Sequence, residues 1–176
     1  LSFDGVDDYV AVENIQLEGL SDFTIHKKIS FNNNPNTSMI GILGSSEGGG
    51  YRKKYSIHFN PHNVDGNNPN TYVWHSILST DDSQNPIWHD FTNPLLDENK
   101  QYEFTLIREN LNNGTAEYRY YIDNILQDSV ISGSHTPYVN SEFRIGSDGE
   151  GWSFLNGNMD ELLIWDRVLS EEEISG

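Results

Sequence analysis

The sequence predicts an all-β protein in which two antiparallel sheets pack face to face as a sandwich, with one short helix near the C-terminus. Strand-forming residues (Tyr, Phe, Trp, Ile, Val and Thr) are plentiful, and 15 Gly together with many Asn and Asp supply turns. Several short segments alternate apolar and polar side chains with a period of two, which is typical of strands with one buried face. We expect residues 1–176 to form a single domain around one core.

The N-terminal segment is predicted to form two short strands on either side of a turn at residues 4–8, here called the acidic turn. This turn carries three carboxylates, those of Asp4, Asp7 and Asp8. Three carboxylates so close together repel one another unless a cation binds them or water solvates them fully. The turn is therefore a candidate site for a metal ion.

The next strand is expected at residues 23–31, where four aromatic or aliphatic residues share one face. Lys27 falls on that same face and breaks its apolar pattern. Either the strand bulges at this point, or His26, Lys27 and Lys28 line a solvated surface that could meet a ligand such as an anionic sugar. Because charges on strands usually serve solubility and edge protection, the solvated surface is the favoured interpretation.

The middle of the chain is expected to alternate strands with polar loops. Further strands are predicted at residues 39–44, 51–59, 71–78, 101–108, 116–123 and 142–146. The Asn113-Gly114 pair indicates a tight hairpin turn, and Asp123-Asn124 indicates a second one, since Asn tolerates a left-handed conformation. Loops are expected at residues 60–70, which are rich in Asn, and around residues 86–90.

Residues 157–165 are predicted to form the last strand. Regular alternation puts Asp160 on the same face as two core aliphatics, Leu162 and Ile164. A carboxylate on such a face needs a hydrogen bond, a counter-charge or a metal ion. The capping-box sequence Ser-Glu-Glu-Glu that follows predicts the start of a short helix.

Both ends of the chain carry longer signatures: FDGVDDYVAV at residues 3–12 and IGSDGEGWSFLNGNMDELLIWDRVLSEEEI at residues 145–174, with DFTI at 22–25 and YYIDN at 120–124 between them. These stretches resemble the signatures of LamG-like domains, the laminin G, pentraxin and concanavalin A group of jelly-roll sandwiches. The resemblance spans nearly the whole chain and implies that the first and last strands lie side by side. Members of the group serve as glycan-binding modules, adhesion domains and spacers, so the fold does not choose the function.

Charge and composition narrow the choice of partners. With 10 Lys and Arg against 27 Asp and Glu, the formal net charge is −17, which makes nucleic acid and anionic membranes poor partners. No apolar run approaches the roughly 20 residues of a membrane helix, so no membrane insertion is expected. The lack of Cys excludes disulfides and thiolate chemistry. These features fit a bacterial protein that is secreted or lies at the cell surface and is stabilised by calcium instead of disulfides. We expect the chain to be one module of a larger protein, beside other domains.

Calcium is the predicted cofactor. Ca²⁺ takes about six to eight oxygen ligands from carboxylates, carbonyls and water. Asp4 and Asp7 of the acidic turn, together with Asp160, could supply them if the first and last strands are neighbours. Alternatively, these carboxylates accept hydrogen bonds from turn amides and no ion binds.

A carbohydrate site is predicted in the loops at one end of the sandwich. Trp152 stands in a glycine-rich loop and would be the platform on which a sugar ring stacks, with Trp88 and Trp74 as further aromatics. Asp148 and Asn156 would bond the hydroxyl groups. Alternatively, these tryptophans belong to the core.

No catalytic motif is present in the sequence. Asp160 and Glu161 are adjacent, so they face opposite sides of a regular strand and do not form the carboxylate pair of a glycosidase. The sequence therefore predicts a non-catalytic binding module for carbohydrate. The alternatives are a polysaccharide-degrading enzyme of concanavalin A-like fold and a protein-binding or structural adhesion domain.

Overall fold

The computed structural model describes residues 1–13, 15, 20–32, 40–46, 54–60, 73–78, 87–91, 100–133, 142–148 and 153–176. For residues 40, 46, 54–56, 58–60, 73–78 and 87–91 it describes the backbone alone. In this part of the chain no helix is long or apolar enough to span a lipid bilayer.

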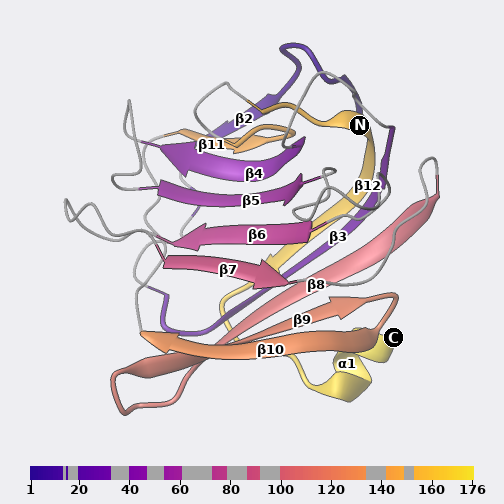
Figure 1. Cartoon of the computed structure of the whole chain (residues 1–176). Helices are drawn as coiled ribbons and strands as arrows, with labels where there is room; N and C mark the ends of the chain where they lie inside the picture. The colour runs from indigo at the N-terminus through magenta and orange to yellow at the C-terminus, as the bar shows by residue number, and fades with distance from the viewer. Residues whose placement is uncertain are drawn as a thin grey trace, which may run out of the picture.

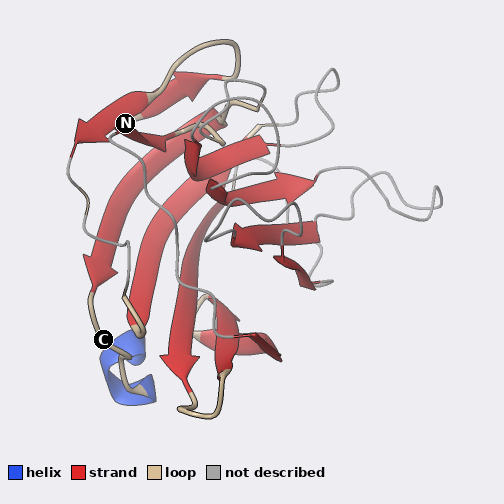
Figure 2. Ribbon diagram, turned by 90° about the vertical axis from the view of Figure 1, so that its left-hand side faces the viewer, coloured by secondary structure: helices blue, strands red, loops and turns tan. Residues whose placement is uncertain are grey.

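The strands of the described residues form two six-stranded antiparallel sheets, seen as two layers in Figures 1 and 2. Sheet A has the order β1 (Ser2–Asp4), β12 (Asn156–Trp165), β3 (Phe23–Phe31), β8 (Gln101–Asn110), β9 (Thr115–Ile122) and β10 (Ile125–Gly133). Sheet B has the order β2 (Val10–Glu13), β11 (Glu142–Ile145), β4 (Ile40–Ser46), β5 (Lys54–Asn60), β6 (Val73–Leu78) and β7 (Ile87–Phe91). The predicted two-sheet sandwich is confirmed.

The acidic turn carries the chain from one sheet to the other. β1 pairs with β12 at the edge of sheet A, whereas β2 pairs with β11 at the edge of sheet B. The two N-terminal strands are therefore present, but they belong to different layers. The pairing of β1 with β12 confirms that the first and last strands lie side by side.

Aromatic side chains fill much of the core between the sheets. The rings of Phe104 and Tyr120 stack with centroids 6.4 Å apart, and those of Phe31 and Tyr102 stack at 6.5 Å. A fully buried side chain of this size contributes about 1.5–3 kcal/mol relative to an exposed one. The same cluster also contains Phe3, Phe23, Ile25, Ile29, Ile42, Leu43, Ile57, Leu106, Tyr118, Phe143, Leu155 and Met159.

Lys27 is a charged residue within this core. The pairing of β3 with β8 runs without a shift from Phe23 to Ser30, so Lys27 keeps the inward face of Ile25 and Ile29 and is fully buried. Desolvation lowers the pKa of its ammonium group well below 10.5. Both interpretations from the sequence, a bulge at Lys27 and a solvated surface, are wrong for this residue, because regular pairing with β8 fixes its direction.

A second cation, Arg108 on β8, is also buried. Its Nε donates a hydrogen bond to the hydroxyl of Tyr118 at 3.1 Å, and its Nη1 donates to the carbonyl oxygen of Ser21. The guanidinium carbon lies 5.8 Å from the centre of the Tyr118 ring. These contacts offset the cost of removing the guanidinium from water.

A β-bulge in β12 decides which of its side chains face the core. The register with β3 shifts between Met159 and Glu161, so that Met159 is buried and Leu162 also packs against the core. Asp160 lies at the bulge and is exposed. The prediction that Asp160 points the same way as the core aliphatics is therefore wrong, since regular alternation does not hold across a bulge.

The predicted C-terminal helix is present as α1 (Glu171–Ser175), which lies beside sheet A (Figure 2). The hydroxyl of Ser170 accepts a hydrogen bond from the backbone N–H of Glu173, and the Glu173 carboxylate accepts one from the backbone N–H of Ser170. The capping box is therefore confirmed. Ile174 is buried in a small cluster with Ile107 of β8, which fixes the helix to the outer face of sheet A.

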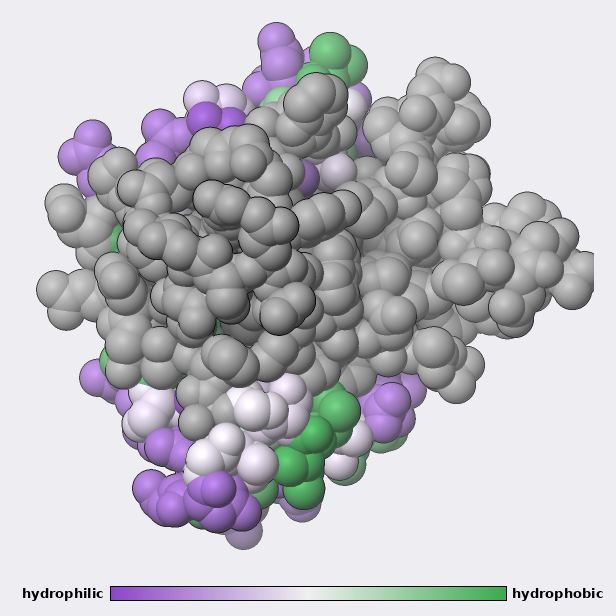
Figure 3. All heavy atoms as spheres, turned by 60° about the vertical axis from the view of Figure 1, so that its left-hand side comes forward, coloured by the Kyte–Doolittle hydropathy of each residue, from purple (hydrophilic) through white to green (hydrophobic). Residues whose placement is uncertain are grey.

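The loop expected around residues 86–90 is wrong, because Ile87–Phe91 pairs with β6 as the strand β7, whereas β10 completes the hairpin expected at Asp123-Asn124. β10 follows the tight turn at Asp123 and Asn124, whose φ angles of 49° and 64° confirm the expected left-handed conformation. β10 leaves Ile125, Leu126 and Ile131 exposed. Figure 3 shows apolar side chains low on the face that it draws, at the height of β8 to β10 in Figure 1.

Candidate functional site

Three neighbouring strands of sheet A, namely β12, β3 and β8, present polar side chains on the face that points away from the core. The outward residues are His26 and Lys28 on β3, Glu103 and Thr105 on β8, and Glu161, Leu163 and Trp165 on β12. The strand register puts Lys28 at the level of Glu103 and Glu161, and His26 at the level of Thr105. Sequence-distant side chains therefore meet on one surface.

The helix α1 and the turn between β9 and β10 enclose this surface as a pocket of about 370 Å³, here called the outer pocket. Ile174 of α1 borders one side, and Asn124 borders another. Asp123 holds the turn in place, because its backbone N–H donates to the Glu103 carbonyl at 2.8 Å and its carboxylate accepts from the Glu103 N–H at 3.0 Å. Oδ1 of Asn124 is itself buried and has no hydrogen-bond donor among the described residues.

Lys28 links two carboxylates on the floor of the outer pocket. Its Nζ lies 3.0 Å from Oε1 of Glu103 and 3.2 Å from Oε2 of Glu161. The hydrogen bonds that its ammonium group donates to Glu103, and then to Glu161, raise the pKa of Lys28, so it stays charged. The floor thus carries one cation held between two anions.

His26 and Trp165 complete the lining. Nδ1 of His26 lies 2.9 Å from the Thr105 hydroxyl, and the imidazole is half-buried. Burial lowers the pKa of His26 below 6.5, more than the nearby carboxylates raise it, so the ring is mainly neutral at neutral pH. Trp165 is partly exposed and offers an indole beside these polar groups. Together they can bond hydroxyl groups and pack against an apolar ring face.

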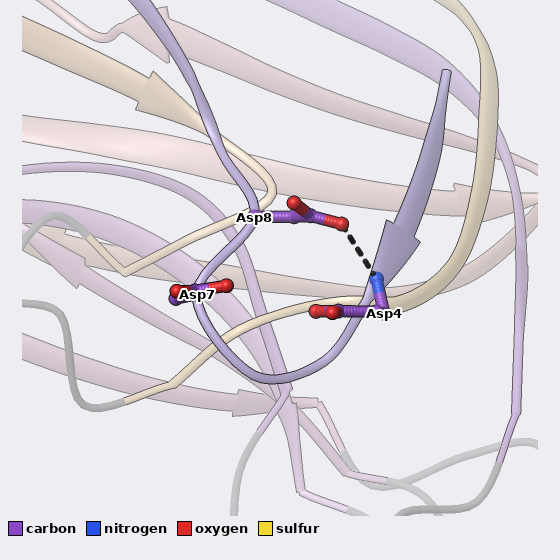
Figure 4. A group of neighbouring side chains, drawn as sticks. All are labelled: Asp4, Asp7 and Asp8. Carbon is purple, nitrogen blue, oxygen red and sulfur yellow. Dashed lines mark hydrogen bonds between the residues drawn. The ribbon is translucent and has the colours of Figure 1, made fainter.

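The acidic turn gathers its carboxylates as the sequence suggests. One oxygen each from Asp4, Asp7 and Asp8 lies within 4.8 Å of the others, and all three residues are exposed (Figure 4). Oδ1 of Asp4 accepts from the Val6 N–H at 2.8 Å, and Oδ2 of Asp8 accepts from the Asp4 N–H at 3.1 Å. These are the turn-amide contacts of the alternative interpretation. Oxygen ligands for a hard cation are present, and calcium itself stays a prediction.

Asp160 does not join this group. Asp4 pairs with Asn156, whereas the α-amino group of Leu1 donates to the carbonyl of Met159 at 2.8 Å. Asp160 therefore lies about four residues farther along β12 than the partner of Asp4, which corresponds to roughly 13 Å. The structure brings together Asp4 and Asp7 of the predicted metal ligands and places Asp160 elsewhere.

The predicted loop-end ligand site is only partly described. Asp148 is buried next to Gly41 of β4, where Ser147 and Phe154 form a β-bridge, so its side chain does not lie on the surface of the predicted loop-end site. Asn156 is half-exposed at the start of β12 and next to the acidic turn. Trp152 lies outside the described residues. The side chains of Trp74 in β6 and Trp88 in β7 are likewise not described.

Sequence reasoning noted the charges of His26 and Lys28 but missed the residues that complete the outer pocket. Thr105, Asn124 and Trp165 lie on segments that the sequence predicted as strands or turns without a functional role. The available signal was the polar alternate positions of β8 and β12. These positions predict a shared surface only when the order of the strands across sheet A is known, and that order differs from their order in the chain.

Comparisons with known proteins bear on the whole chain. A family model described as "Concanavalin A-like lectin/glucanases superfamily" matches residues 4–175. The NanB sialidase from Streptococcus pneumoniae is similar in structure, with a TM-score of 0.72 and 14% identity, over 99% of this chain and 27% of the sialidase. The CBM40 of the Ruminococcus gnavus IT-sialidase, also solved with α2,3-sialyllactose bound, has a TM-score of 0.68 and 10% identity over 98% and 95% of the two chains.

The binding domain of botulinum neurotoxin serotype G is also similar, with a TM-score of 0.58 and 13% identity over 95% of this chain and 39% of that one. The chain thus spans about a quarter of the sialidase and most of the separate CBM40. Comparison with curated protein sequences gives no match. At these identities the structural likeness concerns the fold.

Proposed function

Because the chain belongs to the concanavalin A-like lectin/glucanases superfamily, we propose that it is a non-catalytic binding module that holds a glycan in the outer pocket. The jelly-roll relationship predicted from the sequence is thereby confirmed, while the ligand and its position belong to this proposal. The similar CBM40 and neurotoxin domains support a binding role. A secreted or cell-surface location and a bacterial origin remain predictions from the sequence.

The composition of the outer pocket is the observation that carries the proposal. A sugar presents hydroxyl groups around its rim and C–H groups on its ring face. Glu103 and Glu161 offer acceptors, His26 with Thr105 offers both donor and acceptor, and an indole lies beside them. Such a combination suits a polyhydroxylated ligand with one apolar face.

The arrangement of the two glutamates favours binding over hydrolysis. A glycosidase places its carboxyl groups on either side of the scissile bond, with one of them protonated. Here the ammonium group of Lys28 lies between Glu103 and Glu161, within 3.2 Å of both, where the glycosidic oxygen would have to lie.

A glycan array followed by titration calorimetry tests the proposal. Trp165→Ala is expected to weaken binding at least about fivefold, because loss of a stacking aromatic at a hot spot costs about 1 kcal/mol or more. Tyr9→Ala is the control, since Tyr9 is 40% exposed and contacts Arg144 away from the pocket. Trp152→Ala tests the loop-end site predicted from the sequence. Unchanged affinity in Trp165→Ala, with circular dichroism intact, would show that the ligand binds elsewhere.

A further inference from the structure

We infer that the outer pocket selects neutral sugars and disfavours sugars that carry a carboxylate, an inference that rests on the proposed function of this pocket. It concerns the class of ligand, which neither the fold nor the relatives settle.

Among the described residues that line the outer pocket, no cationic side chain is free of a carboxylate partner. Lys28 is the cationic side chain among the described lining residues, and it is already held by Glu103 and Glu161 at 3.0 and 3.2 Å. Glu173 on the helix side is paired with Arg167 at 2.7 and 2.9 Å, so neither of these two adds a free charge. His26 is mainly neutral at neutral pH. With one ammonium group between two carboxylates, the floor of the pocket keeps a net negative charge.

The remaining polar groups suit hydroxyls. The glutamate oxygens that do not face Lys28 can accept hydrogen bonds from vicinal hydroxyl groups. Thr105 and His26 form a neutral donor and acceptor pair at 2.9 Å. A neutral pyranose can satisfy these groups without bringing a charge, while its ring face packs against Trp165.

A sugar carboxylate would meet the opposite environment. It needs Lys, Arg or clustered N–H donors, and here it would come to lie beside carboxylates in a protein of net charge −17. To bind through the third N–H of Lys28, it would have to lie beside the carboxylates of Glu103 and Glu161, which repel it. The anionic sugar suggested by the charges of His26 and Lys28 in the sequence is thus disfavoured by their neighbours. The α2,3-sialyllactose seen with the Ruminococcus gnavus CBM40 belongs to that protein.

The test compares matched sugars on the full chain by titration calorimetry at neutral pH and low salt. The probes are lactose against α2,3-sialyllactose and cellobiose against cellobiouronic acid. In the wild type, at least one neutral member is expected to bind roughly fivefold or more tightly than its acidic partner. Glu161→Gln removes one negative charge from the pocket, so the preference for the neutral sugar should fall about fivefold. Glu13→Gln, on β2 of the other sheet, removes the same charge and should leave the preference unchanged.

The outcomes separate the inference from the proposed function. Tighter binding of the acidic sugars, abolished by Trp165→Ala, would overturn the inference and leave the pocket as a glycan site. An equal change of preference in Glu161→Gln and Glu13→Gln would also overturn it, because the effect would then come from net charge. Binding that is insensitive to Trp165→Ala, or no binding of any probe, would overturn the proposed function together with the inference.

Discussion

Replacing Lys27 with methionine is expected to stabilise the protein. Lys27 lies at 0% exposure on the inner face of β3, between Ile25 and Ile29 on the same face, in a layer of stacked aromatic rings. Its pKa is lowered by desolvation, which means that burial disfavours the charged form. Methionine has a similar length and shape and carries no charge, so the Lys27→Met variant keeps the packing and removes that cost.

The magnitude follows from the burial of the whole side chain. Exchanging buried ionic groups for apolar ones of similar volume is neutral or stabilises by about 1–4 kcal/mol, and the added apolar group contributes about 0.8 kcal/mol. We expect the free energy of unfolding to rise by about 1–3 kcal/mol. For a chain of 176 residues, this corresponds to a Tm higher by roughly 2–12 °C.

The assay is thermal and urea unfolding followed by circular dichroism, with Lys28→Met as the matched control. Lys28 is the next residue on β3, faces outward and links two carboxylates, so its replacement should bring no gain. A lysine with a lowered folded pKa binds fewer protons in the fold than in the unfolded chain. Wild-type stability therefore rises with pH up to about 10.5, and the advantage of Lys27→Met should shrink in that direction. A lower Tm for Lys27→Met at neutral pH would refute this reasoning.

Three further predictions concern the helix, the loop next to β4 and the acidic turn. The hydrogen bonds from Arg167 and Ser170 lower the pKa of Glu173 from 4.5 to about 2, so their contribution is present above pH 4.5 and is lost as the pH falls towards 2; Glu173→Gln should lower the Tm at neutral pH and have little effect near pH 2. Gly41→Ala should destabilise by about 1–3 kcal/mol or more in urea, since the added Cβ would lie 2.3 Å from the carbonyl oxygen of Ser153. If the predicted calcium binds, the Tm should be higher in calcium than in chelator. At a calcium concentration of 100 times the Kd, the free energy of unfolding should rise by about 2.7 kcal/mol, and Asp7→Asn should remove that rise.

The sequence was sufficient where local patterns decide the structure. The strand at residues 23–31, the tight turn at Asp123 and Asn124 and the capping box at Ser170 all follow from period, turn chemistry or capping, and each is present. Family signatures at the two ends of the chain supplied the pairing of β1 with β12. These features depend on neighbours in sequence or on a known fold.

What could not be predicted depends on contacts between distant segments. The side chain of Lys27 points inward because β3 pairs with β8 in a regular register. That register cannot be predicted from a polar residue within an apolar pattern. The outer pocket needs β12, β3 and β8 side by side, an order that the chain does not follow, and a helix placed over them. The burial of Asp148 depends on a bridge between Ser147 and Phe154. The polarity of His26 predicted that it lies on the surface, but its neighbours on β8 and β12 follow only from the order of the strands in the sheet.

The bulge in β12 also has a consequence for how this strand tolerates changes of length. Asp160 is the extra residue of the bulge. Met159 before it points inward, and Glu161 after it points outward. Deleting Asp160 would restore regular alternation with both neighbours still on their present sides. Deleting a residue after Glu161 would instead turn every later side chain over, so that Trp165 would enter the core. A strand that is intolerant of deletion over most of its length therefore contains one place where a residue can be lost without changing what its outer face offers to solvent.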